Sequence, residues 1–148
     1  MASVINFNDE CVELAQSVKR GKTAHAIFSI TDSNSCSIAY SSNEKKASCE
    51  EQWEDFTSHL PKDSCAYGIA GFKYVSPTDQ VERCKTVFVL WAPSGSKQKD
   101  KMMVAFSSNG VVNKIGSGGI GCRVQGGGPA SVDYEEVLNQ VLARATVK

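Results

Sequence analysis

The stretch from Lys85 to Met103 constrains the fold more than any other part of the chain. It reads K-T-V-F-V-L-W-A-P-S-G-S-K-Q-K-D-K-M-M. Its apolar run predicts a buried strand that ends beyond Trp91, because Pro93 cannot donate to a ladder hydrogen bond. Ser94 or Ser96 is a suitable N-cap for a helix that follows. A buried strand followed by a helix rich in lysine and methionine is typical of a surface that docks a partner, rather than of a catalytic pocket.

Length and charge restrict the class of protein. The chain has 148 residues, which predicts a single domain spanning residues 1–148. Its formal net charge of zero argues against bulk attraction to nucleic acid or to an anionic membrane. The N-terminal residues are polar and acidic, unlike a secretory signal, and no apolar run approaches the roughly 20 residues that span a bilayer. We therefore expect a cytoplasmic protein without nucleic-acid partners.

The six cysteines are dispersed along the chain, with no C-x-x-C pair. They are Cys11, Cys36, Cys49, Cys65, Cys84 and Cys122. In a chain of this size without a secretory signal, the pattern favours reduced thiols with a structural role. Neither these cysteines nor His25 and His59 cluster at the spacing of zinc ligands, so we expect no metal site and no cofactor.

Hydrophobic periodicity and turn residues predict nine elements. They are a helix over about 9–19, strands over 24–31 and 35–41, a helix over about 48–60, strands over 65–75 and 85–91, a helix from about 94 that can reach 114, a short strand over 122–125, and a helix that begins at 131 or 133. The order α-β-β-α-β-β-α-β-α lacks strict βαβ alternation. It predicts an α/β protein of the α+β type, with a mixed sheet and helices packed on its faces.

A set of motifs in a fixed order resembles the actin-depolymerising factor/cofilin family over nearly the whole chain. The motifs are Asn8-Asp9-Glu10-Cys11-Val12, F-T-S-H-L-P-K-D-S-C-A-Y from Phe56 to Tyr67, Arg83-Cys84-Lys85, Trp91-Ala92-Pro93, Lys99-Asp100-Lys101-Met102-Met103 and Val124-Gln125-Gly126. The resemblance implies the ADF-homology fold, with a central mixed sheet of about five strands flanked by helices on both faces. It also implies a monomeric, cytoskeletal protein that binds actin without catalysis.

The resemblance assigns one set of residues to a face that binds actin monomers and filaments. They are Ala2, Ser3, Val4, Lys99, Lys101, Met102 and Ser107. On a helical wheel Met102 lies beside Ala105 and Phe106, with the two lysines to either side. A thioether fills a shallow cleft well, and flanking cations would pair with an acidic surface such as that of actin. Spacing alone favours a core position for Met102 and Phe106, because amphipathic helices usually bury their apolar stripe. We expect Met103 in the core.

Ser3 resembles the regulatory phosphorylation site of the family. A phosphoserine adds about −1.5 to −2 charge, which would repel an acidic partner. The alternative is an unmodified serine in the N-terminal tail. Val4 stands where many relatives have glycine.

A second face, used by the family on filaments only, would contain Arg83, Lys85 and Arg144. This chain departs from the family there, since Asn139-Gln140 replaces a Glu-Arg pair and Arg144 is out of register with that pair. Elsewhere Ser108 replaces a common lysine, and Ala70-Gly71 replaces an aromatic residue and an aspartate. Weaker filament binding or severing is therefore a hypothesis.

Other functions have less support from the sequence. Phosphoinositides are associated with the family, and Lys97, Lys99, Lys101 and Lys114 are the candidate residues here. A coactosin-like or glia-maturation-factor-like protein is an alternative within the binding class. From another class, a small enzyme would use Cys65 or Cys84 with a histidine.

One run of glycines has the spacing of a nucleotide-binding motif. Gly116, Gly118 and Gly121 fit G-x-G-x-x-G, but a predicted helix precedes them and a strand follows. The motif needs the opposite order, because pyrophosphate binds at the N-terminus of the following helix. We expect a connector instead.

Overall fold

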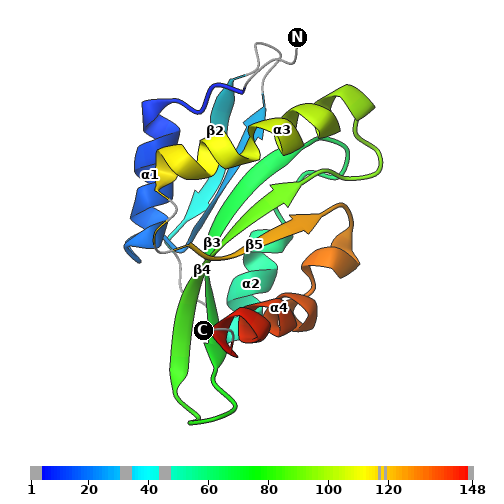
Figure 1. Ribbon diagram of the computed structural model, residues 1–148. Helices are drawn as coiled ribbons and strands as arrows, with labels where there is room; N and C mark the ends of the chain where they lie inside the picture. Colours follow the sequence, from blue (N-terminus) through cyan, green and yellow to red (C-terminus); the bar gives the residue numbers. More distant parts are fainter. Residues whose placement is uncertain (1–4, 31–34, 44–47, 117, 119, 147–148) are drawn as a thin grey trace.

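A five-stranded sheet lies between two pairs of helices (Figure 1). The computed structural model describes residues 5–30, 35–43, 48–116, 118 and 120–146. The elements are α1 (Asp9–Lys19), β1 (His25–Ile30), β2 (Cys36–Ser42), α2 (Cys49–Thr57), β3 (Ala66–Val75), β4 (Glu82–Trp91), α3 (Gln98–Ile115), β5 (Ile120–Gly126), the 3-10 turn η1 (Pro129–Val132) and α4 (Tyr134–Thr146). Their order is the predicted one, with η1 added before α4.

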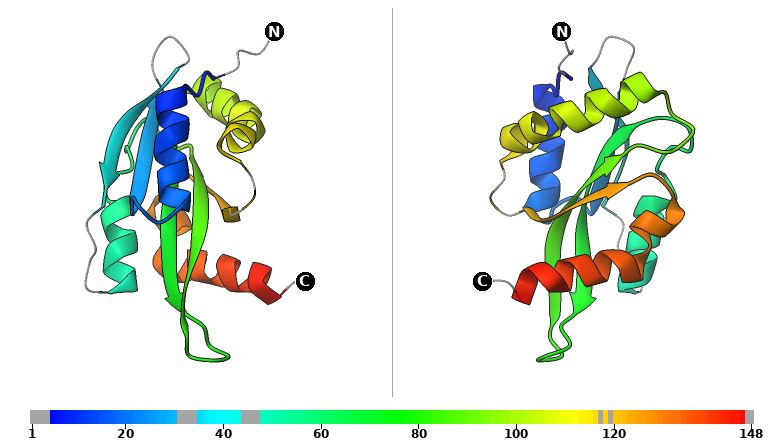
Figure 2. Two further views of the ribbon diagram at one scale, coloured as in Figure 1. Left: turned by 90° about the vertical axis from the view of Figure 1, so that its left-hand side faces the viewer. Right: turned by 45° about the vertical axis from the view of Figure 1, so that its right-hand side comes forward.

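The strand order is β2-β1-β3-β4-β5. Every neighbouring pair is antiparallel except β4 and β5, which run parallel, so the predicted mixed sheet is confirmed. A parallel pair needs a crossover connection, and α3 supplies it. Strands β3 and β4 pair from Ala66–Trp91 to Val75–Glu82, and their hairpin projects beyond the rest of the sheet (Figure 2).

Alternation along the strands divides the core into two layers. In β4, Phe88 and Leu90 belong to the layer shared with α1 and α3, whereas Val87 and Val89 belong to the layer shared with α2 and α4. Asn8 caps α1 by accepting a hydrogen bond from the Cys11 amide, at 3.0 Å. Ser48 caps α2, because its Oγ accepts a hydrogen bond from the Glu51 amide at 3.1 Å. Local sequence thus starts both helices where the pattern predicted.

Helix α3 begins later than the sequence predicted. Its N-cap is Lys97, and neither Ser94 nor Ser96 caps it. Ser96 Oγ is occupied in the preceding turn, where it donates to the Pro93 carbonyl at 2.5 Å. The C-terminal half does remain helical to Ile115 despite its weak helix formers, because Val111, Val112 and Ile115 are buried against the sheet. Tertiary burial therefore overrides local propensity here.

The glycine run lies between α3 and β5, as the sequence predicted. Gly116 is the C-cap of α3 with φ +102°, a conformation that favours glycine. Strand β5 begins at Ile120 and is longer than expected. Among the described residues, α3 precedes the run and β5 follows it, which is the reverse of the order that the pyrophosphate motif needs.

Candidate functional site

Helix α3 presents an apolar outer face as well as an apolar inner one. Met103 and Val104 are buried, at 7% and 0% exposure, which confirms the expected core position of Met103. Met102 and Phe106 are instead 64% and 61% exposed. The core position that spacing favoured for Met102 and Phe106 is therefore wrong. We name the exposed line formed by Met102, Ala105, Phe106, Asn109 and Gly110 the α3 ridge.

The predicted lysines lie at the N-terminal end of the α3 ridge. Lys99 is exposed, and Lys101 is half-buried with its Nζ 3.4 Å from the Ser94 carbonyl oxygen. Lys97 is exposed at the N-cap. Lys114, the fourth lysine considered for phosphoinositides, lies about 20 Å further along the helix from Lys101 at 1.5 Å per residue. Its Nζ donates to the Phe7 carbonyl at 3.1 Å, so the four lysines do not form one cluster.

The N-terminal segment packs along α3. The Ile5 amide donates to Ser107 Oγ at 3.0 Å, and Ser107 is only 4% exposed. Ser107 therefore holds the start of the described chain in place and presents little surface of its own. Ala2, Ser3 and Val4, the other predicted members of this face, lie outside the described residues.

A hollow of about 350 Å³ separates this segment from the C-terminal half of α3. It is lined by Ile5, Asn6, Phe7, Ser107, Gly110, Val111 and Lys114. Two of its polar groups are already engaged, Ser107 Oγ by the Ile5 amide and Lys114 Nζ by the Phe7 carbonyl. The remaining lining is largely apolar.

The three residues of the predicted filament face lie on different elements and have different contacts. Arg83, in the projecting hairpin, forms an ion pair with Asp79, and both side chains are about half exposed. The pKa of Asp79 is lowered, chiefly because its carboxylate accepts a hydrogen bond from the Val81 amide. The Arg83 guanidinium lowers it further. Lys85 is exposed and lies close to Gly121 of β5. Arg144 lies in α4, but its side chain is outside the described part of the structure.

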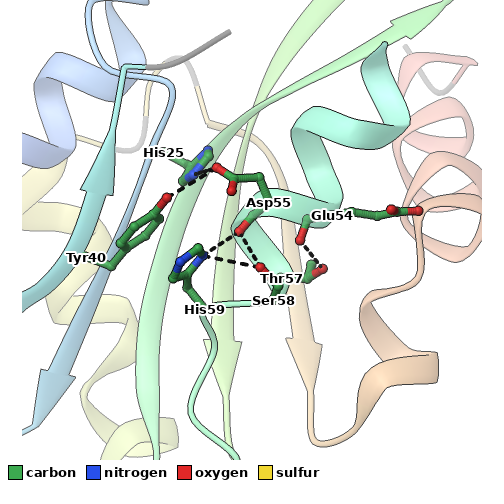
Figure 3. A network of polar contacts seen from close by, with 7 residues as sticks. All are labelled: His25, Tyr40, Glu54, Asp55, Thr57, Ser58 and His59. Carbon is green, nitrogen blue, oxygen red and sulfur yellow. Dashed lines mark hydrogen bonds and ion pairs between the residues drawn. The ribbon is translucent and has the colours of Figure 1, made fainter. Parts of the chain in front are cut away.

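Both histidines belong to a network that joins β1, β2 and α2 (Figure 3). His25 Nε2 lies 3.1 Å from Asp55 Oδ2, and the Tyr40 hydroxyl donates to the same oxygen at 3.3 Å. The Tyr40 and His59 rings stack with their centroids 3.6 Å apart. His59 Nδ1 is 2.7 Å from the Asp55 carbonyl oxygen, which can only accept, so Nδ1 carries a proton. The network fastens α2 to the edge of the sheet.

The adjacent carboxylates of α2 do not act together. Asp55 faces His25, whereas the Glu54 side chain points away from both histidines (Figure 3). This divergence follows from the helix geometry, because consecutive side chains do not share a face.

The two thiols considered for an enzyme, Cys65 and Cys84, are poorly suited to nucleophilic chemistry. Burial raises the pKa of Cys65, whose Sγ donates to Ser96 Oγ at 3.4 Å. Partial desolvation of its sulfur also raises the pKa of Cys84, although the residue as a whole is exposed. A raised pKa leaves less thiolate at neutral pH, and the thiolate is the reactive form. Within the described ranges, no group of three or more His, Cys, Asp or Glu residues has the arrangement of a metal site.

We expect slow thiol modification of the folded protein at pH 7. Cys84 is exposed and should react first with a chromogenic disulfide, whereas buried Cys11 and Cys36, whose pKa values are raised to about 11 and about 12, should react only on unfolding. Denatured protein provides the control, since all its thiols become accessible. One thiol that reacts faster than free cysteine would instead favour the enzyme hypothesis.

Sequence reasoning missed several parts of the site. It gave Ser107 a direct contact, although the side chain is buried under Ile5. It did not place Gly110 beside the hollow, and it did not bring His25 together with Asp55. Each of these features depends on contacts between distant segments, which a periodic pattern does not report. The exposure of Met102 beside buried Met103 could be found only by placing α3 on the sheet.

None of the helices in the described parts of the chain has the length and apolar character required to cross a membrane.

Comparison with known proteins identifies a family that matches nearly the whole chain. The model of the family described as cofilin/tropomyosin-type actin-binding protein matches residues 4–142. A cofilin of Mycosarcoma maydis is 30% identical over 142 residues, covering 95% of this chain and 96% of its own.

Two solved structures share the fold along almost their whole length. Actin depolymerization factor 2 of Plasmodium berghei superposes with a TM-score of 0.82 at 25% identity, covering 97% of this chain and 99% of its own. A cofilin of Streptomyces griseoflavus superposes with a TM-score of 0.77 at 29% identity, covering 93% of this chain and 96% of the cofilin chain. Both the family match and the fold span nearly the whole chain, and the chain therefore belongs to the cofilin/tropomyosin-type family of actin-binding proteins.

Proposed function

We propose that this protein binds actin monomers and filaments and promotes filament depolymerisation and severing. Family membership supports actin binding. The observation that carries the proposal on this chain is the exposure of Met102, at 64%, directly beside buried Met103. A methionine that serves the core would not face solvent, and exposed thioethers are common at binding surfaces. Lys99 and Lys101 place positive charge beside it.

The proposed mechanism uses α3 and the N-terminal tail as a wedge. The α3 ridge enters a cleft on actin, and the lysines orient it against an acidic surface. If one actin conformation binds better than another, binding shifts the population of filament subunits toward it and weakens their contacts. Disassembly then needs no chemical step on this protein.

Phosphorylation of Ser3 is part of the proposal as a means of regulation. Ile5 is held against α3 by Ser107, and Ser3 is only two residues before it in the chain. A phosphate on Ser3 would add negative charge to the N-terminal segment and oppose binding to an acidic partner. Phosphoinositide binding is a further proposal, and the presence of Lys97, Lys99 and Lys101 at one end of α3 supports it.

The double substitution Lys99→Ala with Lys101→Ala tests the binding surface. We expect the affinity for monomeric actin to fall about 10–30-fold, and its dependence on salt to weaken, because rim charges act chiefly on encounter and orientation. Titration of fluorescently labelled actin monomers and pelleting with filaments measure both partners. The matched control is Arg20→Ala with Lys22→Ala, which removes the same charge from exposed positions at the end of α1.

Two results would contradict the proposal. Wild-type protein that binds neither monomers nor filaments would eliminate it. Equal loss of affinity in the control pair would show that net charge, and not the α3 surface, is responsible.

A second candidate function is monomer binding with weak severing. The observation that favours it is the ion pair of Arg83 with Asp79, which partly neutralises the cation at the hairpin. The uncharged pair Asn139-Gln140 adds no charge on α4. Monomer affinity without stoichiometric filament pelleting would favour this candidate, and brisk severing would contradict it.

A further inference from the structure

Gly110 is an unexpected residue in the interior of α3. Glycine lowers helix stability relative to alanine, because its backbone loses more conformational freedom on folding. A Cβ atom placed on Gly110 would meet no atom within 4 Å beyond the backbone of its own helix, as far as the described residues go. The packing of the described chain therefore gives no reason for glycine at this position.

The position of Gly110 on α3 is continuous with the proposed actin-binding surface. Met102, Phe106 and Gly110 are spaced four residues apart, so they follow one line along the helix. From Met102 to Asn113, every exposed side chain of α3 is uncharged, in a segment whose residues are all described. The lysine-flanked end of the α3 ridge thus continues along a stretch of α3 that has no charged side chain of its own, and Arg123 of β5 donates to Asn109 Oδ1 beside it at 2.8 Å.

Gly110 also borders the hollow of about 350 Å³ between α3 and the N-terminal segment. The buried walls of this hollow include Ile5, Phe7 and Val111, at 4%, 1% and 2% exposure. This buried lining is apolar and therefore suits an apolar group, while Ser107 Oγ accepts from the Ile5 amide and Lys114 Nζ donates to the Phe7 carbonyl. Gly110 contributes no side chain to this lining.

We infer that Gly110 and the adjoining hollow form a second contact of the actin-binding surface, which receives an apolar side chain of actin and lets the actin backbone approach α3 closely. The inference rests on the proposed function. It extends the surface from the N-terminal end of α3 to its C-terminal half. It gives Gly110 a role in recognition that its own fold does not require.

The substitution Gly110→Ala separates recognition from stability. We expect the melting temperature to rise by about 3 °C, because alanine is the better helix former and has space for its methyl group. We expect the affinity for monomeric actin to fall about 10-fold, since the methyl group raises the rim of the hollow. Gly110→Leu, which fills more of the space, should weaken binding further. Thermal unfolding and titration of labelled actin monomers measure the two effects.

Asn113→Ala is the matched control, because Asn113 is exposed on the same helix and does not line the hollow. It should stabilise the helix without changing affinity. Unchanged actin affinity in Gly110→Ala, while Lys99→Ala with Lys101→Ala still weakens binding, overturns the inference and leaves the proposed function standing. A fall in the melting temperature of Gly110→Ala also overturns it, because the glycine would then be needed by the packing of the protein itself.

Discussion

Met102→Glu is expected to lower the affinity for monomeric actin about 100-fold. Such a change corresponds to about 2.7 kcal/mol, within the range of central interface residues. The carboxylate would lie between Lys99 and Lys101, cancel part of their attraction for an acidic partner, and lose its hydration in an apolar contact. Because Met102 is 64% exposed in the free protein, the free energy of unfolding should change by less than about 0.5 kcal/mol.

Asn139→Glu is the control for charge. It makes the same change in net charge at an exposed position of α4, on the opposite side of the sheet from α3. The affinity of the Asn139→Glu variant for monomeric actin should equal that of the unsubstituted protein. Near-normal affinity of Met102→Glu would show that the α3 ridge does not meet actin.

Phe56→Ala is expected to lower the free energy of unfolding by about 3–5 kcal/mol, the usual cost of removing a large buried aromatic ring. Phe56 has no exposed surface, and its ring lies 5.0 Å from that of Trp53 and 5.5 Å from that of His25, measured between centroids. The loss would loosen α2 together with the His25–Asp55 network. Urea denaturation followed by tryptophan fluorescence measures it.

Gly68 offers a second measurement of the same contact. A Cβ atom on Gly68 would lie 2.6 Å from Phe56 Cζ, so Gly68→Ala must displace the ring and should be destabilising. In the Phe56→Ala background that clash is gone, and adding Gly68→Ala should then cost little. Additive losses in the double variant would mean that the two residues are not in contact in solution.

Much of the fold could be predicted because local patterns and tertiary packing agree. The caps at Asn8 and Ser48 start α1 and α2, and the apolar run ending at Trp91 is a central strand. The start of α3 could not be predicted, because Ser94 and Ser96 are both locally acceptable caps, whereas in the structure Ser96 Oγ bonds within the Pro93–Ser96 turn and the helix begins after Lys97.

The candidate site was less predictable than the fold. Lys99, Lys101 and Met102 could be assigned from an ordered set of motifs, since these residues are contiguous in sequence. The hollow beside Gly110 could not, because its walls come from segments about a hundred residues apart. Spacing in the sequence also misjudged Phe106, since a helix can have apolar residues on two faces and only its placement shows which face is covered.

The crossover position of α3 has a consequence for how complexes form. The helix is fixed at one end by β4 and at the other by β5, and Ser107 ties the N-terminal segment to its middle. A surface preorganised in this way loses little conformational entropy on association. We therefore expect the rearrangement that accompanies binding to occur in actin, with this protein acting as the rigid body.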